Sequence, residues 1–82
     1  MSKPRIRFIG EGWERYARDV MPADAQKVQR IETRRAFYAG AIQALGVVLR
    51  IAALPEAEGV ALLQDMHLEV TEFSERADKG EA

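Results

Sequence analysis

A group of basic and aromatic residues in the first half of the chain offers the best candidates for chemistry. At about 100° per residue, Lys27, Arg30 and Arg34 fall within one sector of a helix, and Tyr38 follows about one turn later. Guanidinium groups form paired hydrogen bonds with phosphate, and aromatic rings stack on bases. The pattern therefore predicts a site for a phosphate-bearing ligand. The predicted set is Lys27, Arg30, Arg34 and Arg35 for the phosphates, with Trp13, Tyr16 and Tyr38 for stacking.

The same residues also have a purely structural interpretation. Exposed helix faces are commonly rich in Lys and Arg, and Phe37 and Tyr38 then belong to the core. Trp13 and Tyr16 would in that case cap the core. Arg35 lies among apolar residues on one face of the predicted long helix, so its charge needs a partner or water. Its expected partners are acids of the last helix, namely Glu69, Glu72 or Glu75.

Nothing in the composition favours catalysis. The chain has no cysteine and one histidine, His67, which excludes disulfides, thiolate metal sites and multi-histidine sites within one chain. His67 has no partner in a known catalytic motif, and we expect it at a flank or an interface. Glycine-rich phosphate loops and triad signatures are also missing from the sequence. We therefore predict no enzyme, no catalytic residue, no cofactor and no metal.

Charge is divided unevenly along the 82 residues. Residues 1–35 carry nine Lys/Arg and five Asp/Glu, a net charge of +4. Residues 36–82 carry three Lys/Arg and eight Asp/Glu, a net charge of −5. Either oppositely charged helices pack together, within the chain or between subunits, or the basic half holds an anion. The total of −1 gives no overall attraction to nucleic acid. Weak nucleic-acid binding through the basic N-terminal arm is a third alternative.

Hydrophobic periodicity predicts one all-α domain over residues 1–82. Pro22 and Pro55 suit the first turns of helices, and Gly80 suits a C-terminal stop. The short link at Leu54 predicts an antiparallel helical hairpin. The alternation over residues 5–9 suits a strand or an extended arm before Gly10. The expected elements are an extended arm at 1–12, a short helix at 13–21, a long helix at 22–53 and a C-terminal helix at 55–79.

The long helix carries a heptad seam with alternating spacings of three and four. We expect Leu45 and Leu49 on this seam to pack against Leu62, Leu63 and Met66 of the last helix. The seam comprises Val28, Ile31, Arg35, Tyr38, Ile42, Leu45, Leu49 and Ala52.

The stretch 37–54 is apolar nearly all round, with Gln43 and Arg50 as its polar interruptions. A helix of this kind must be buried on nearly all sides, which the rest of a small chain cannot provide. Membrane insertion is disfavoured by Gln43 and Arg50. We therefore predict a homo-oligomer, with small residues on the face away from the seam allowing close approach. These interface residues are Ala36, Gly40, Ala44 and Val47.

The segment 34–40, Arg-Arg-Ala-Phe-Tyr-Ala-Gly, resembles a stretch of small helical proteins encoded by bacteriophages and prophages. The resemblance extends over residues 22–75 and includes Pro22, Gln29, Glu32 and an acidic-aromatic patch at 69–73. Several phage families of this size block bacterial immunity, some by sequestering nucleotide second messengers in helical homo-oligomers. The resemblance implies an accessory protein that binds a cyclic nucleotide or ADP-ribose-type signal.

The alternative to a nucleotide sponge is a protein–protein interaction module. Such a module would inhibit or scaffold a host or phage protein without a small ligand. No hydrophobic segment typical of a signal peptide follows Lys3, Arg5 and Arg7. Under either interpretation we expect the protein in the cytoplasm of the bacterial host.

Overall fold

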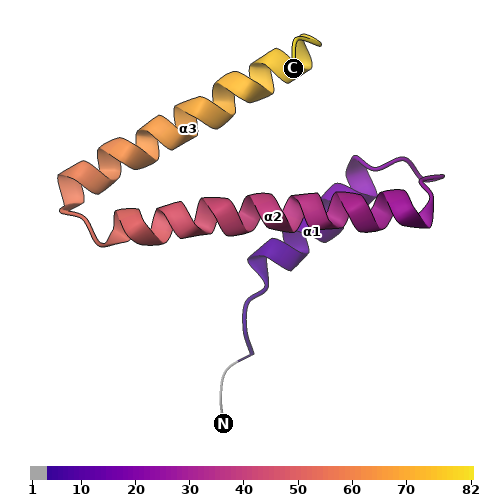
Figure 1. The fold of residues 1–82 in the computed structure, drawn as a ribbon, viewed down its shortest axis with the longest axis horizontal. Coiled ribbons are helices and arrows are strands. Elements are labelled where there is room, and N and C mark those ends of the chain that lie inside the picture. The colour runs from indigo at the N-terminus through magenta and orange to yellow at the C-terminus, as the bar shows by residue number, and fades with distance from the viewer. Residues whose placement is uncertain (1–3) are drawn as a thin grey trace. The chain divides into compact units, whose positions relative to one another are not determined.

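The computed structural model describes residues 4–82 and contains three helices (Figure 1). They are α1 (Phe8–Asp19), α2 (Lys27–Ala52) and α3 (Glu56–Asp78). No strand occurs among the described residues. The all-α prediction is therefore confirmed.

The chain forms two compact units whose boundary falls inside α2. The first, here the N-terminal unit, contains residues 4–44 and so holds α1 and the first part of α2. The second, the C-terminal unit, is Leu45–Ala82 and holds the end of α2 and all of α3.

Helix α1 begins earlier than its predicted start at residue 13. Residues 1–3 of the predicted arm lie outside the described residues, residues 4–7 are non-helical, and the helix starts at Phe8. The predicted arm is thus wrong over residues 8–12. The Glu11 N–H donates to the Arg7 carbonyl at 2.8 Å, and the Glu11 carboxylate lies in the first turn, where the helix dipole favours it. Gly10 lies within this helix and is buried; a Cβ built on it would lie 2.9 Å from the Arg7 guanidinium.

Helix α2 begins at Lys27, five residues after the predicted start at Pro22. The link between α1 and α2 instead turns, with the Ala25 N–H donating to the Pro22 carbonyl at 3.1 Å. This path places the Met21 side chain inside the unit, where it is only 8% exposed. The Met21 N–H donates to the Tyr16 carbonyl at 3.2 Å. The predicted start at Pro22 is thus wrong, and residues 22–26 form a turn that accompanies the burial of Met21.

The junction of α2 and α3 agrees with the predicted boundaries within one residue. Residues 53–55 connect the two helices, and Pro55 precedes α3, whose first turn carries Glu56 and Glu58. Ile51 is 7% exposed here and lies against Gly59. A Cβ on Gly59 would lie 3.2 Å from the Ile51 carbonyl oxygen, so the absent side chain allows close contact between the two helices.

Helix α3 ends at the predicted glycine stop. Gly80 has a φ of 74°, a left-handed conformation that L side chains rarely adopt. The Glu81 N–H donates to the Arg76 carbonyl at 2.8 Å, which satisfies one of the last carbonyls of the helix.

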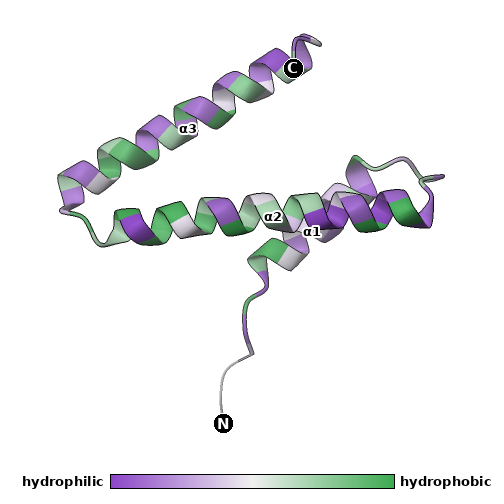
Figure 2. Cartoon of the chain, in the orientation of Figure 1, coloured by the Kyte–Doolittle hydropathy of each residue, from purple (hydrophilic) through white to green (hydrophobic). Residues whose placement is uncertain are grey.

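The face that α2 turns toward α3 is not the predicted heptad seam. Leu45 and Leu49 are 54% and 63% exposed, whereas Ile51, which is not on the seam, is buried against Gly59 of α3. Spacing misleads here because the stretch 37–54 is apolar nearly all round, and Figure 2 shows hydrophobic residues prevailing on the half of α2 that leads to α3. A helix that is apolar on several faces does not reveal from periodicity which face meets its neighbour.

Candidate functional site

An aromatic cluster joins α1 to α2 in the N-terminal unit. Phe37 lies at its centre, with ring centroids 5.7 Å from Trp13, 5.9 Å from Tyr16 and 6.1 Å from Tyr38. Trp13 and Tyr16 stack at 6.1 Å with an interplanar angle of 25°. The backbone of α1 also approaches closely, because a Cβ on Gly12 would lie 3.5 Å from the Phe37 ring. The structure therefore brings the three predicted stacking residues together around a fourth ring.

This arrangement supports the structural interpretation of Trp13 and Tyr16. Their rings contact Phe37, a residue that the ligand-site prediction left out. Aromatic side chains bury large areas and prefer offset or edge-to-face pairs. In the sequence, the position of Phe37 beside Tyr38 in the apolar stretch indicates a core residue. Trp13 and Tyr16 thus hold α1 on α2, and ligand stacking by either ring stays a prediction.

A shallow hollow of about 350 Å³ lies on α2 beside this cluster, lined by Ile31, Arg34, Arg35 and Tyr38. The Arg34 guanidinium carbon is 5.6 Å from the centroid of the Tyr38 ring, which is a cation–π distance. The hollow therefore combines two cations with an aromatic ring on one helix face.

Arg35 makes an ion pair different from the predicted one. Its Nη1 lies 3.6 Å from Glu32 Oε1, one turn earlier on the same helix, rather than pairing with Glu69, Glu72 or Glu75. Both side chains are largely exposed, and such pairs contribute only about 0–1 kcal/mol. Arg35 therefore remains free enough to bind an anion in the hollow.

The other two predicted phosphate ligands do not line the hollow. The Arg30 guanidinium donates hydrogen bonds to the Pro22 and Ala23 carbonyls at 3.4 and 3.3 Å, so this arginine closes the turn before α2. Lys27 is an exposed residue at the start of α2. The cationic candidates within the hollow are therefore Arg34 and Arg35.

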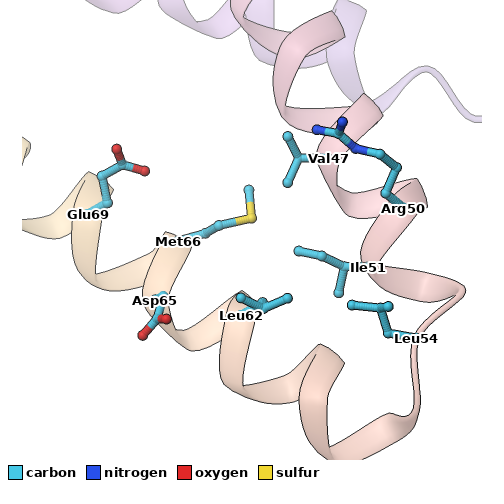
Figure 3. A pocket seen from close by; sticks show the side chains of 8 residues that line it. All are labelled: Val47, Arg50, Ile51, Leu54, Leu62, Asp65, Met66 and Glu69. Carbon is cyan, nitrogen blue, oxygen red and sulfur yellow. The ribbon is translucent and has the colours of Figure 1, made fainter.

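The C-terminal unit contains a larger groove of about 590 Å³ between the end of α2 and the start of α3 (Figure 3). Its floor is apolar, and its charged residues divide by helix, with Arg50 on α2 and Asp65 and Glu69 on α3. Within the described chain, Arg50 forms no ion pair with either acid. The lining comprises Val47, Arg50, Ile51, Leu54, Leu62, Asp65, Met66 and Glu69.

Sequence reasoning missed this groove but included Val47 in the predicted oligomer interface. The structure directs Val47 into the groove. Ala36, Gly40 and Ala44 are exposed, and no atom lies within 4 Å of where a Gly40 Cβ would be. That these small residues form an interface stays a prediction.

Three further polar side chains have local partners. The Thr33 and Thr71 hydroxyls donate to the backbone carbonyls of Gln29 and His67, at 2.7 and 2.8 Å. Asp19 accepts a hydrogen bond from Arg18 at 3.0 Å and raises the pKa of this arginine. Over residues 4–82, no three acidic or histidine side chains gather in a group suited to a metal ion.

Comparison with protein-family models, curated proteins and solved structures gives no match. Helix α2 is long and apolar enough to cross a membrane by length and composition, with a mean hydropathy of 1.2 and 6% of the apolar window buried. Mostly buried core helices of soluble proteins and signal sequences near an N-terminus meet the same criterion, so one such helix is weak evidence for a membrane span.

Proposed function

We propose that this chain is a non-catalytic helical interaction module whose α2–α3 hairpin acts by binding protein. The observation that carries the proposal is the amount of exposed apolar surface. Among the described residues, only Met21 and Ile51 are buried large hydrophobic side chains, one in each unit. Ile42 and Leu49, by contrast, are 71% and 63% exposed. Exposed apolar surface of this kind, flanked by polar residues, is typical of interaction sites.

Burial by a protein explains this surface better than insertion into lipid. Each square ångström of apolar surface removed from water stabilises by about 25 cal/mol, whether protein or lipid covers it. The apolar stretch of α2, however, includes Gln43 and Arg50, and an arginine within hydrocarbon is costly. A protein partner can supply hydrogen bonds and a carboxylate to these two side chains.

The proposal is tested by photo-crosslinking in cells. A photoreactive phenylalanine analogue replaces Leu49, and the matched control places it at Glu72, an exposed polar position of α3. We expect a discrete protein adduct from position 49 and little or none from position 72. Crosslinking of position 49 to lipid alone, or to nothing, would contradict the proposal.

The hollow on α2 supports a second candidate function, binding of a phosphate-bearing nucleotide. Arg34 and Arg35 supply two guanidinium groups beside the Tyr38 ring, a combination suited to a phosphate next to a base. Sequestration of such a signal is also what the resemblance to phage-encoded proteins implies.

A thermal-shift screen with cyclic dinucleotides, cyclic mononucleotides and ADP-ribose derivatives tests this second candidate. A ligand at a hundred times its Kd stabilises the folded state by about 2.7 kcal/mol, so a binder raises Tm clearly. Arg34→Glu should abolish the shift, whereas Arg15→Glu, the same charge change on exposed α1 surface, should retain it. A flat response of ligand-free protein across the panel would exclude these nucleotide classes.

A further inference from the structure

We infer that a second copy of this chain occupies the α2–α3 groove, with Arg50 of each copy against Asp65 and Glu69 of the other. This inference rests on the proposed function, since it names a protein partner for a further apolar surface of the hairpin, whose lining does not include Ile42 or Leu49. Three features of the groove support it: an apolar floor, unpaired charges, and the distribution of these charges between the two helices.

The apolar floor is incompletely covered within the chain. Ile51 is buried beneath it, but Leu54 and Leu62 on either side remain 40% and 42% exposed. Met66 and Val47 extend the floor away from the turn (Figure 3). An unbranched methionine side chain adapts readily to an incoming surface. The groove can therefore receive apolar side chains of a helix from another molecule.

The charged rims identify the occupant. Arg50 lies on the α2 side, and Asp65 and Glu69 lie on the α3 side. These charges form no ion pair across the groove in the described chain. A two-fold rotation that lays α2 of one copy over α3 of the other brings unlike charges together on both sides at once. The groove is thus complementary to itself, which is the requirement of a two-fold symmetric interface.

Other classes of occupant match less well. The acids of α3 continue beyond the groove with Glu72 and Glu75, so this side repels phosphate and anionic lipid headgroups. A helix of another protein would need an acidic edge opposite Arg50 and a basic edge opposite Asp65 and Glu69. This chain presents both edges on the hairpin itself.

A charge-swap experiment on the full chain tests the inference by sedimentation equilibrium. The wild type should sediment with twice the 9.2 kDa chain mass. Arg50→Glu should raise the dimer Kd by about tenfold or more, because it places like charges together on both sides. The double variant Asp65→Arg/Glu69→Arg should weaken the dimer similarly.

The decisive variant combines all three substitutions and restores unlike charges in reversed order. It should recover most of the wild-type affinity, which a merely structural effect of the single changes would not allow. Lys79→Glu changes the net charge as Arg50→Glu does but lies outside the groove, and it should leave the Kd unchanged. Circular dichroism of every variant reports whether the helices persist.

Two results would overturn the inference. One is a wild-type monomer at roughly 100 µM, well above the micromolar Kd of a moderately stable dimer. The other is a dimer whose Kd does not respond to any of the charge changes. A monomer that still gives a protein adduct from position 49 would refute the second copy but preserve the proposed function. A monomer without an adduct would refute both.

Discussion

The two units join their helices by different means. In the N-terminal unit, four aromatic rings centred on Phe37 close the contact between α1 and α2. In the C-terminal unit, Ile51 packs on Gly59, and the aliphatic side chains beside them leave an open groove. Aromatic rings bury more area per residue than aliphatic side chains do. A few rings can therefore hold two helices together, whereas the mainly aliphatic contact between α2 and α3 leaves a groove beside it.

Under the two proposed functions, this difference gives the units different tasks. The N-terminal unit completes its main contact internally and presents Arg34 and Arg35 outward, which suits an anionic ligand. The C-terminal unit leaves its apolar floor open between Arg50 and the α3 acids, which suits a protein. The opposite net charges of residues 1–35 and 36–82 agree with this division.

Truncation of the aromatic centre should have the largest effect on stability. Phe37→Ala removes the ring that contacts Trp13, Tyr16 and Tyr38. It should lower the free energy of unfolding by about 3 kcal/mol, the lower end for a buried phenylalanine, because Phe37 is half-buried. Urea denaturation at one fixed protein concentration measures this loss. A loss below about 1 kcal/mol would mean that the cluster does not hold α1 on α2.

Substitution of Gly59 should rank second and would show how closely α2 and α3 approach. Gly59→Leu forces a side chain toward the Ile51 carbonyl and should cost about 2 kcal/mol, as overpacking does. The matched control is Gly40→Ala, where no atom lies within 4 Å, and it should stabilise α2 by about 1 kcal/mol through helix propensity. Equal effects at the two glycines would contradict the close contact. Loss of dimer mass in Gly40→Leu would instead support the predicted small-residue interface.

The smallest effect is expected on the predicted seam. Leu45 is 54% exposed and does not line the groove, so Leu45→Ala should change stability by only about 0.5 kcal/mol. If Leu45 packed against α3, as the heptad spacing predicts, Leu45→Ala would lower the free energy of unfolding by about 2–5 kcal/mol. Urea titration of Leu45→Ala beside Ile51→Ala distinguishes the two faces of α2 directly.

The helices themselves could be predicted because their signals are local. Pro55 and Gly80 mark the limits of α3, and the apolar stretch before Leu54 marks the end of α2. The start of α1 was missed because Gly10 suggests a break when only local propensity is considered. In the structure this glycine allows Arg7 to lie against the helix, which is a contact that no local pattern reveals.

The candidate sites could be predicted only in part. Basic and aromatic residues recurring on one helix face indicated Arg34, Arg35 and Tyr38, and these do line one hollow. The same spacing also included Arg30, whose hydrogen bonds to the preceding turn depend on the late start of α2. The groove depends on which face of an all-round apolar helix meets α3, and helical periodicity does not contain that information.

If a second copy completes the apolar groove of the C-terminal unit, folding and association are linked. Urea unfolding followed by circular dichroism at two protein concentrations about 100-fold apart tests it most directly. For a dimer that unfolds to two monomers, the urea midpoint should rise with protein concentration. An increase of about 100-fold should add about 2.7 kcal/mol to the apparent free energy of unfolding per dimer. A cooperative transition whose midpoint is the same at both concentrations, with a monomer mass, would contradict the account.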